Sequence, residues 1–137
     1  MLSRVADTLY WMSRFVERAE GVTRLVEIHR DTDLESDARS GDFGYWHSTL
    51  QSICAKEQFE EDELEEPDTF LLFSSQWNNS VINSINSARE NARMVRDQLS
   101  EEIWVELNSL YHFLNSKKAI LEYQNDESSF FRRVIRF

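Results

Sequence analysis

The chain has 137 residues, a net charge of −10 and a hydrophobic content of 41%. This length fits one domain, and the hydrophobic content, which includes nine Phe and four Trp, supplies a packed core and argues against global disorder. Three Gly and one Pro are too few for the turns of a many-stranded sheet, so the composition predicts an all-α fold. Because 15 basic residues stand against 25 acidic ones, nucleic-acid binding is disfavoured.

The cysteine content and the N-terminus indicate a compartment. The single cysteine, Cys54, excludes an intrachain disulfide and is expected to be a small apolar residue near a helix interior. The charges of Arg4 and Asp7 interrupt what would be the apolar part of a signal peptide, and no window approaches the ~18 apolar residues of a membrane span. We therefore expect a soluble, cytoplasmic protein without a membrane partner.

The first thirty residues carry one helical pattern, expected to run from an N-cap at Ser3 to near Arg30. Apolar residues recur three or four positions apart, which is typical of a helix that faces a core. At about 100° per residue, several charged residues fall on one edge of that apolar stripe, and this places them against a partner helix rather than in open water. The edge contains Arg4, Asp7, Trp11 and Arg18.

The negative charge is concentrated in residues 31–68, which hold thirteen acidic residues against two basic ones. Residues 31–42 form a polar connector. The run 57–68 is expected to be a solvated, mobile connector, with a docking strip for a basic partner as the alternative. Residues 69–73 are expected to be helical, although their pattern also fits an extended piece. A helix between the two connectors is indicated by Phe43, Trp46, Leu50 and Ile53.

Two further long helices are expected in the second half of the chain. One covers 81–99 after N-cap candidates at 78–80, and the other covers 101–121 after an N-cap at Ser100. The tail 128–137 is too apolar for a free end and indicates the start of another helix that needs a covering surface. The sequence therefore predicts a single domain, built as an antiparallel bundle of about four long helices with an acidic connector.

Charged residues of the helices predicted over 3–30 and 81–99 are expected to form an interhelix polar network. An unpaired buried charge costs several kcal/mol, so a half-buried Arg18 should pair with an acid such as Glu90 or Asp97. In the alternative, the arginines converge on an anionic carboxylate or phosphate, and the chain is an enzyme or a ligand-binding domain. The candidate residues for either role are Arg4, Asp7, Glu17, Arg18, Glu90, Arg93, Arg96 and Asp97.

The sequence contains no recognisable catalytic or metal-binding motif. His29, His47 and His112 lie in separate segments without the spacing of a zinc motif, so a zinc site that adds Glu27 or Glu106 is the weaker of two interpretations. A glycine-rich phosphate loop and a nucleophile elbow are both missing. We assign no catalytic residue, no cofactor and no metal ligand.

Two stretches of the sequence carry a family resemblance. The first is MLSRVADTLYWMSRFVERAE, which contains the pair Glu17–Arg18, and the second is SARENARMVRDQLSEEIWVELNSLY. They resemble the start and the second characteristic stretch of the bacterial Alpha-E domain family, a helical family described by a Glu-Arg motif. The second stretch is matched at Ala88, Arg89, Glu90, Asn91, Ala92, Arg93, Arg96, Asp97, Trp104 and Asn108.

The resemblance implies association with ATP-grasp-type ligases and transglutaminase-like proteins in peptide-synthesis or peptide-modification systems. It implies no established activity for the helical domain, so we expect a non-enzymatic accessory or scaffold domain. Family members usually continue beyond the point that corresponds to the C-terminal FFRRVIRF, and the chain thus resembles an N-terminal half. We expect a homodimer, or docking of the missing C-terminal half, to cover the open bundle face and the apolar tail. The expected contacts are Phe130, Phe131, Val134 and Ile135.

Overall fold

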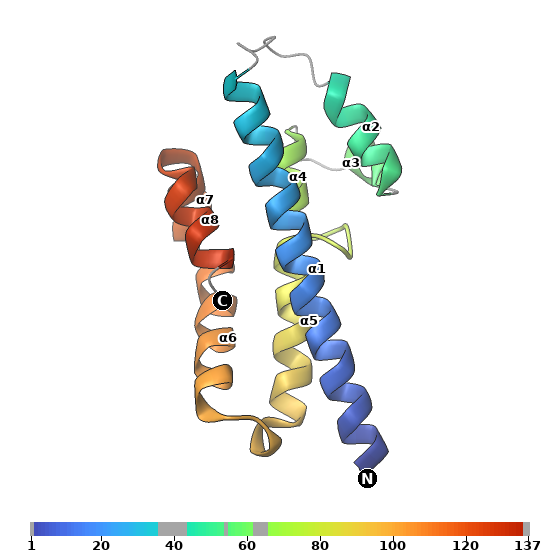
Figure 1. The fold of residues 1–137 in the computed structure, drawn as a ribbon, viewed down its shortest axis with the longest axis vertical. Helices are drawn as coiled ribbons and strands as arrows, with labels where there is room; N and C mark the ends of the chain where they lie inside the picture. Colours follow the sequence, from blue (N-terminus) through green and yellow to red (C-terminus); the bar gives the residue numbers. More distant parts are fainter. Residues whose placement is uncertain (1, 36–43, 54, 62–65, 136–137) are drawn as a thin grey trace.

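The structure is a computed structural model that describes residues 2–35, 44–53, 55–61 and 66–135 (Figure 1). These ranges contain eight α-helices, one 3₁₀ turn and no strand. The all-α prediction is confirmed, whereas the bundle of four long helices is replaced by a larger set of mostly short helices. The elements are α1 (Leu2–Glu35), α2 (Gly44–Ser52), α3 (Lys56–Glu61), α4 (Pro67–Phe73), α5 (Val81–Met94), η1 (Arg96–Gln98), α6 (Glu101–Leu114), α7 (Lys117–Asn125) and α8 (Glu127–Ile135).

Helix α1 is the long axis of the fold. Helix α5 packs along it in the opposite direction, and α6 returns beside α5 (Figure 1). Helices α4 and α8 also contact α1, and α7 packs on both α6 and α8. Within the described ranges, no helix is long and apolar enough to cross a membrane.

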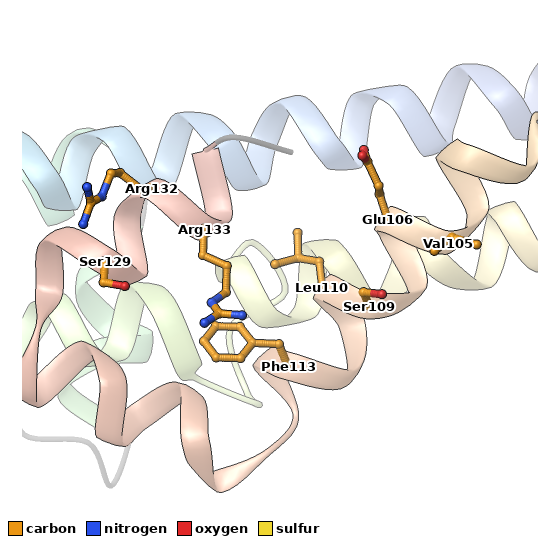
Figure 2. A pocket seen from close by; sticks show the side chains of 8 residues that line it. All are labelled: Val105, Glu106, Ser109, Leu110, Phe113, Ser129, Arg132 and Arg133. Atoms are coloured by element: carbon orange, nitrogen blue, oxygen red, sulfur yellow. The ribbon is translucent and has the colours of Figure 1, made fainter.

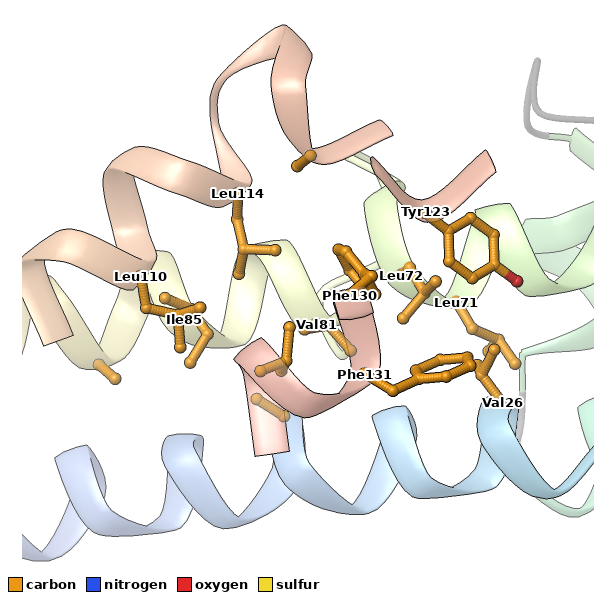
Figure 3. Close-up of a cluster of buried hydrophobic side chains, with 14 of the residues drawn as sticks. Val26, Leu71, Leu72, Val81, Ile85, Leu110, Leu114, Tyr123, Phe130 and Phe131 are labelled. Carbon is orange, nitrogen blue, oxygen red and sulfur yellow. The ribbon is translucent and has the colours of Figure 1, made fainter. Parts of the chain in front are cut away.

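Buried apolar side chains of α8 lie near those of α1, α4 and α5 in the core (Figure 3). Phe130 is fully buried, and its ring centroid lies 5.3 Å from that of Tyr123 and 5.6 Å from that of Phe73. Asp126 helps to fold the tail back into this position, because its Oδ1 accepts the Ser129 N–H at 3.2 Å in the manner of an N-cap.

The tail is therefore not an exposed apolar end. Phe130, Phe131 and Val134 are buried inside the chain and Ile135 is partly buried, so the sequence-based expectation that these four side chains are free to make dimer contacts is wrong. The physical reason is local: the tail covers its own apolar surface by folding onto α1 and α4 as helix α8. Whether the chain forms a homodimer stays a prediction.

The two helices predicted for the second half begin as expected and end earlier. Ser80 and Ser100 are the N-caps. The Ser80 hydroxyl oxygen accepts the Asn83 N–H at 3.2 Å, and the Ser100 hydroxyl oxygen accepts the Ile103 N–H at 3.3 Å. Helix α6 ends at Leu114 because Asn115 Nδ2 donates to the Tyr111 carbonyl at 2.8 Å, and this satisfies a terminal carbonyl of the helix. Helix α5, predicted over 81–99, likewise ends at Met94 rather than at Leu99. Leu121, predicted in the same helix as Ile103, belongs instead to α7, where it is 55% exposed.

The first half departs from the sequence prediction in the acidic region. The expectation of a solvated connector over 57–68 is wrong at its C-terminal end, because Pro67 and Asp68 are buried at the start of α4. At its N-terminal end, Glu57 and Glu60 are exposed but belong to helix α3. Phe59 of α3 contacts the ring of Phe70 edge to face at 5.4 Å, which gives this acidic helix an apolar anchor. The predicted helices around Trp46 and over 69–73 are confirmed. Residues 36–43 and 62–65, and Cys54, lie outside the described residues.

Replacing the most buried ring of the tail tests this packing. We expect Phe130→Ala to lower the free energy of unfolding by about 3–5 kcal/mol, because it removes a fully buried ring and leaves a cavity. Urea unfolding followed by far-UV circular dichroism measures the loss. Val105→Ala is the control: Val105 is 49% exposed, and its loss should be within about 0.5 kcal/mol. A loss below about 1 kcal/mol for Phe130→Ala would show that the tail does not pack in the core.

Candidate functional site

The charged edge of α1 lies on the surface of the fold. Arg4 and Asp7 are exposed, Trp11 is 44% exposed, and Phe15 and Arg18 are partly buried. We call these five residues the α1 edge. Its aromatic rings are in contact, with 6.1 Å between the centroids of Trp11 and Phe15, and the Arg18 guanidinium lies over the Phe15 ring at 5.6 Å. Beside the edge, Glu17 pairs with Arg14 at 3.0 Å.

The expected pairing of Arg18 with Glu90 or Asp97 is wrong. Glu90 instead pairs with Arg93 and with Arg89, at 3.1 Å each, and hydrogen bonds and charge from Arg93 and then Arg89 lower the pKa of Glu90. The helix register explains the miss. Asn91 Nδ2 lies 3.4 Å from the carbonyl oxygen of Thr8, so the antiparallel α5 places Arg18 about 15 Å along the axis from residue 91 and from the acids beside it.

The second family stretch holds α5 against α6. Arg89 Nε donates to Asn108 Oδ1 at 3.2 Å, and its guanidinium lies 4.6 Å from the ring of Tyr111 and 5.6 Å from that of Trp104. Arg96 lies over the same Trp104 ring at 4.7 Å. Cations over aromatic faces stabilise contacts between packed elements, so Arg89 and Arg96 contribute to the packing of α5 and η1 against α6.

The eight candidate network residues therefore do not surround one site. Arg93 forms an ion pair with Glu90 on the surface of α5. The Arg96 guanidinium lies over the Trp104 ring, and Asp97 is exposed in η1. Glu17 and Arg18 make contacts within their own helix. What the sequence placed in one network is divided among the α1 edge, separate ion pairs on the surfaces of α1 and α5, and the contact of Arg96 with α6.

A partly buried polar cluster that the sequence prediction missed joins α1, α4, α7 and α8. Arg30 Nε donates to Glu127 Oε2 at 2.7 Å, and Arg30 Nη1 lies 3.4 Å from Asp68 Oδ2. The hydroxyl of Tyr123 donates to the same Asp68 oxygen. Burial raises the pKa of Tyr123 far above its ordinary value, and the neighbouring charge of Asp68 adds to the effect. We call Arg30, Asp68, Tyr123 and Glu127 the Arg30 cluster.

An open groove of about 680 Å³ lies between α6 and α8 (Figure 2). Arg133 lies over the ring of Phe113 at 4.3 Å, and its Nε is 3.2 Å from Glu122 Oε2. The neighbouring Arg132 is exposed and pairs with no carboxylate of the described residues. The lining residues are Val105, Glu106, Ser109, Leu110, Phe113, Ser129, Arg132 and Arg133.

The described histidines have separate surroundings. The His29 ring stacks on Trp46 with centroids 4.1 Å apart, and its Nε2 is 2.8 Å from Thr49 Oγ1, which ties α2 to α1. His112 is exposed on α6, and the side chain of His47 lies outside the described part of the chain. No three His, Cys, Asp or Glu side chains of the described ranges are placed to share a metal ion.

Comparison with protein-family models places the chain. The model of Alpha-E, a predicted alpha-helical domain with a conserved ER motif, matches residues 1–137. The chain belongs to the Alpha-E family. No curated protein and no solved structure matches it. Glu17–Arg18 is the only Glu-Arg pair in the sequence, so the motif of the family description lies at the α1 edge.

The Arg30 cluster gives stability a pH dependence that Tyr123→Phe should remove. Above a pH of about 10 an unfolded chain loses the Tyr123 proton, whereas the folded chain keeps it because its pKa is raised. The contribution of Tyr123 to the free energy of unfolding is therefore fully present below pH ~10 and decreases as the pH rises above it. We expect Tyr123→Phe to cost about 1–3 kcal/mol at neutral pH, through the lost hydrogen bond to Asp68. That difference should shrink by up to about 1.4 kcal/mol per pH unit above 10.

Urea unfolding at neutral pH and at a pH of about 10.5 measures both effects. The higher pH lies just above the ordinary tyrosine pKa of about 10, so that Tyr123 of the unfolded chain is largely ionised there. Tyr10→Phe is the matched control, because Tyr10 is 56% exposed and should show neither effect. A Tyr123→Phe difference that stays constant with pH would contradict the assignment.

Proposed function

We propose that this Alpha-E domain is a non-enzymatic accessory or scaffold domain that binds a partner protein through the α1 edge. The observation that carries the proposal is the surface position of Glu17 and Arg18, the pair that matches the family's ER motif. Among the described residues, the ion pair of Glu17 and the ring contact of Arg18 are both made within α1. The family's ER motif is conserved although its two side chains add little to the stability of the fold, and binding to a partner would explain that conservation.

The composition and size of the α1 edge support a protein partner. Trp and Arg are the residue types that most often dominate the energy of protein interfaces, and Trp11 and Arg18 are both reachable from solvent. Arg4 and Arg18 are fourteen residues apart, which is about 21 Å along a helix. This length suits one side of a standard interface, which buries about 800 Å² per partner.

The family resemblance suggests which partner to test first. It implies ATP-grasp-type ligases and transglutaminase-like proteins of peptide-synthesis or peptide-modification systems, and we propose the ligase as the partner, in the cytoplasm. The alternative of an anionic substrate held by the arginines of α1 and α5 gains no support, because Arg18 lies about 15 Å along the helix axis from residue 91, and the arginines of α1 and α5 therefore do not converge on one site.

Charge reversal at the edge tests this proposal. We expect Arg18→Glu and Trp11→Ala each to weaken binding to an ATP-grasp-type ligase of the same organism by about tenfold or more. Both variants should keep a free energy of unfolding within about 1 kcal/mol of the unchanged chain, since Arg18 has no carboxylate partner to orphan. Isothermal titration calorimetry measures the affinity and urea unfolding the stability.

Arg24→Glu is the matched control. Arg24 lies on another side of α1, is exposed, and pairs with Glu20 at 2.9 Å, so its reversal changes charge and a surface pair without touching the edge. Equal weakening by Arg18→Glu and Arg24→Glu would contradict a role for the edge. If the chain alone shows a dimer mass by light scattering that Arg18→Glu abolishes, the occupant of the edge is a second copy rather than the ligase.

A further inference from the structure

We propose that the groove between α6 and α8 binds a short acidic peptide segment of a partner protein, at a site separate from the α1 edge. The peptide's carboxylate would meet Arg132 and Arg133, and an adjacent apolar side chain would lie against Val105, Leu110 and Phe113. This inference stands without the proposed function, because α1 contributes no lining residue to the groove.

The groove has the size and the shape for an extended peptide. Its volume of about 680 Å³ falls within the range of ligand sites in proteins, about 300–1,000 Å³. The lining residues of α6 run from Val105 to Phe113, which is about 12 Å along the helix. An extended chain rises about 3.3 Å per residue, so the α6 side of the groove accommodates roughly three to four peptide residues.

The cationic end of the groove is prepared for a carboxylate. Arg133 is held in place by Glu122, which accepts from its Nη2 at 3.2 Å, and by the Phe113 ring beneath it. A fixed guanidinium loses little side-chain freedom when it binds a further anion. Arg132 has no carboxylate partner among the described residues, so its charge is available to the occupant.

The other end of the groove sets the direction of the peptide. Figure 2 shows Ser129 and Arg132 toward one end and Val105 and Glu106 toward the other, with Arg133 and Phe113 between them. An acidic group is therefore attracted to the arginine end and repelled at the Glu106 end. Leu110 and Phe113 between the two ends, and the exposed Val105 at the Glu106 end, provide an apolar wall that a small inorganic anion would leave uncovered.

The probe is the hexapeptide Lys-Leu-Ser-Leu-Glu-Glu, titrated into the full chain and followed by NMR of the backbone amides. We expect shifts at Val105, Ser109 and Ser129, and a dissociation constant that rises about tenfold or more in Arg132→Glu. Arg132→Gln should give a smaller rise, and added salt should weaken binding. Lys118→Glu is the matched control, because it makes the same charge change on the exposed side of α7 and should leave the affinity unchanged.

Peptide variants separate the carboxylate from the apolar contact. Replacing both glutamates by glutamine, or both leucines by serine, should each weaken binding. The proposal is overturned if the hexapeptide causes no shifts in the groove, if Arg132→Glu and Lys118→Glu bind it equally, or if inorganic phosphate or free glutamate binds as tightly as the peptide, which would identify a small-anion site instead.

Discussion

The ion pairs of the partly exposed Arg30 guanidinium with the buried Asp68 and with Glu127 are the interactions on which the upper half of the fold depends. Asp68 is only 5% exposed, and a carboxylate in such a place is tolerated only with compensating partners, which Arg30 and the Tyr123 hydroxyl supply. Since the four members of the cluster come from α1, α4, α7 and α8, satisfying the charge of Asp68 fixes all four helices together. Phe130 then falls into the space that these helices enclose.

The lower half of the fold uses its cations in a different way. Arg89 and Arg96 lie on aromatic rings of α6, and only Arg89 also has a side-chain acceptor there, Asn108. Flat guanidinium groups on rings allow charged residues to pack between two helices without a buried carboxylate. The second stretch of the family resemblance is thus explained largely by the contact between α5 and α6. In the first stretch, buried residues such as Met12 and Ala19 are explained by the packing of α1, whereas Glu17 and Arg18 form no ion pair with another described helix.

Local signals in the sequence predicted the helix starts, and contacts between distant residues decided the rest. Ser80 and Ser100 were recognised as caps because a cap depends on residues next to it in the chain. The helix end at Asn115 was missed because a continuous apolar pattern passes through it. The Arg30 cluster was missed because Asp68 belongs to an acidic run, and its burial depends on Tyr123, which lies 55 residues away in the sequence.

The edge of α1 was identified correctly as a set of residues and interpreted wrongly as a contact within the fold. Periodicity gives the direction in which Arg4, Trp11 and Arg18 point, but it does not show whether a helix of the same chain lies there. In the structure α5 packs along α1, the α1 residues Met12 and Ala19 are buried, and Arg4, Asp7 and Trp11 of the edge are left exposed. The proposal of a partner outside the chain rests on the exposed Arg4 and Trp11 and on the motif pair Glu17–Arg18 beside them.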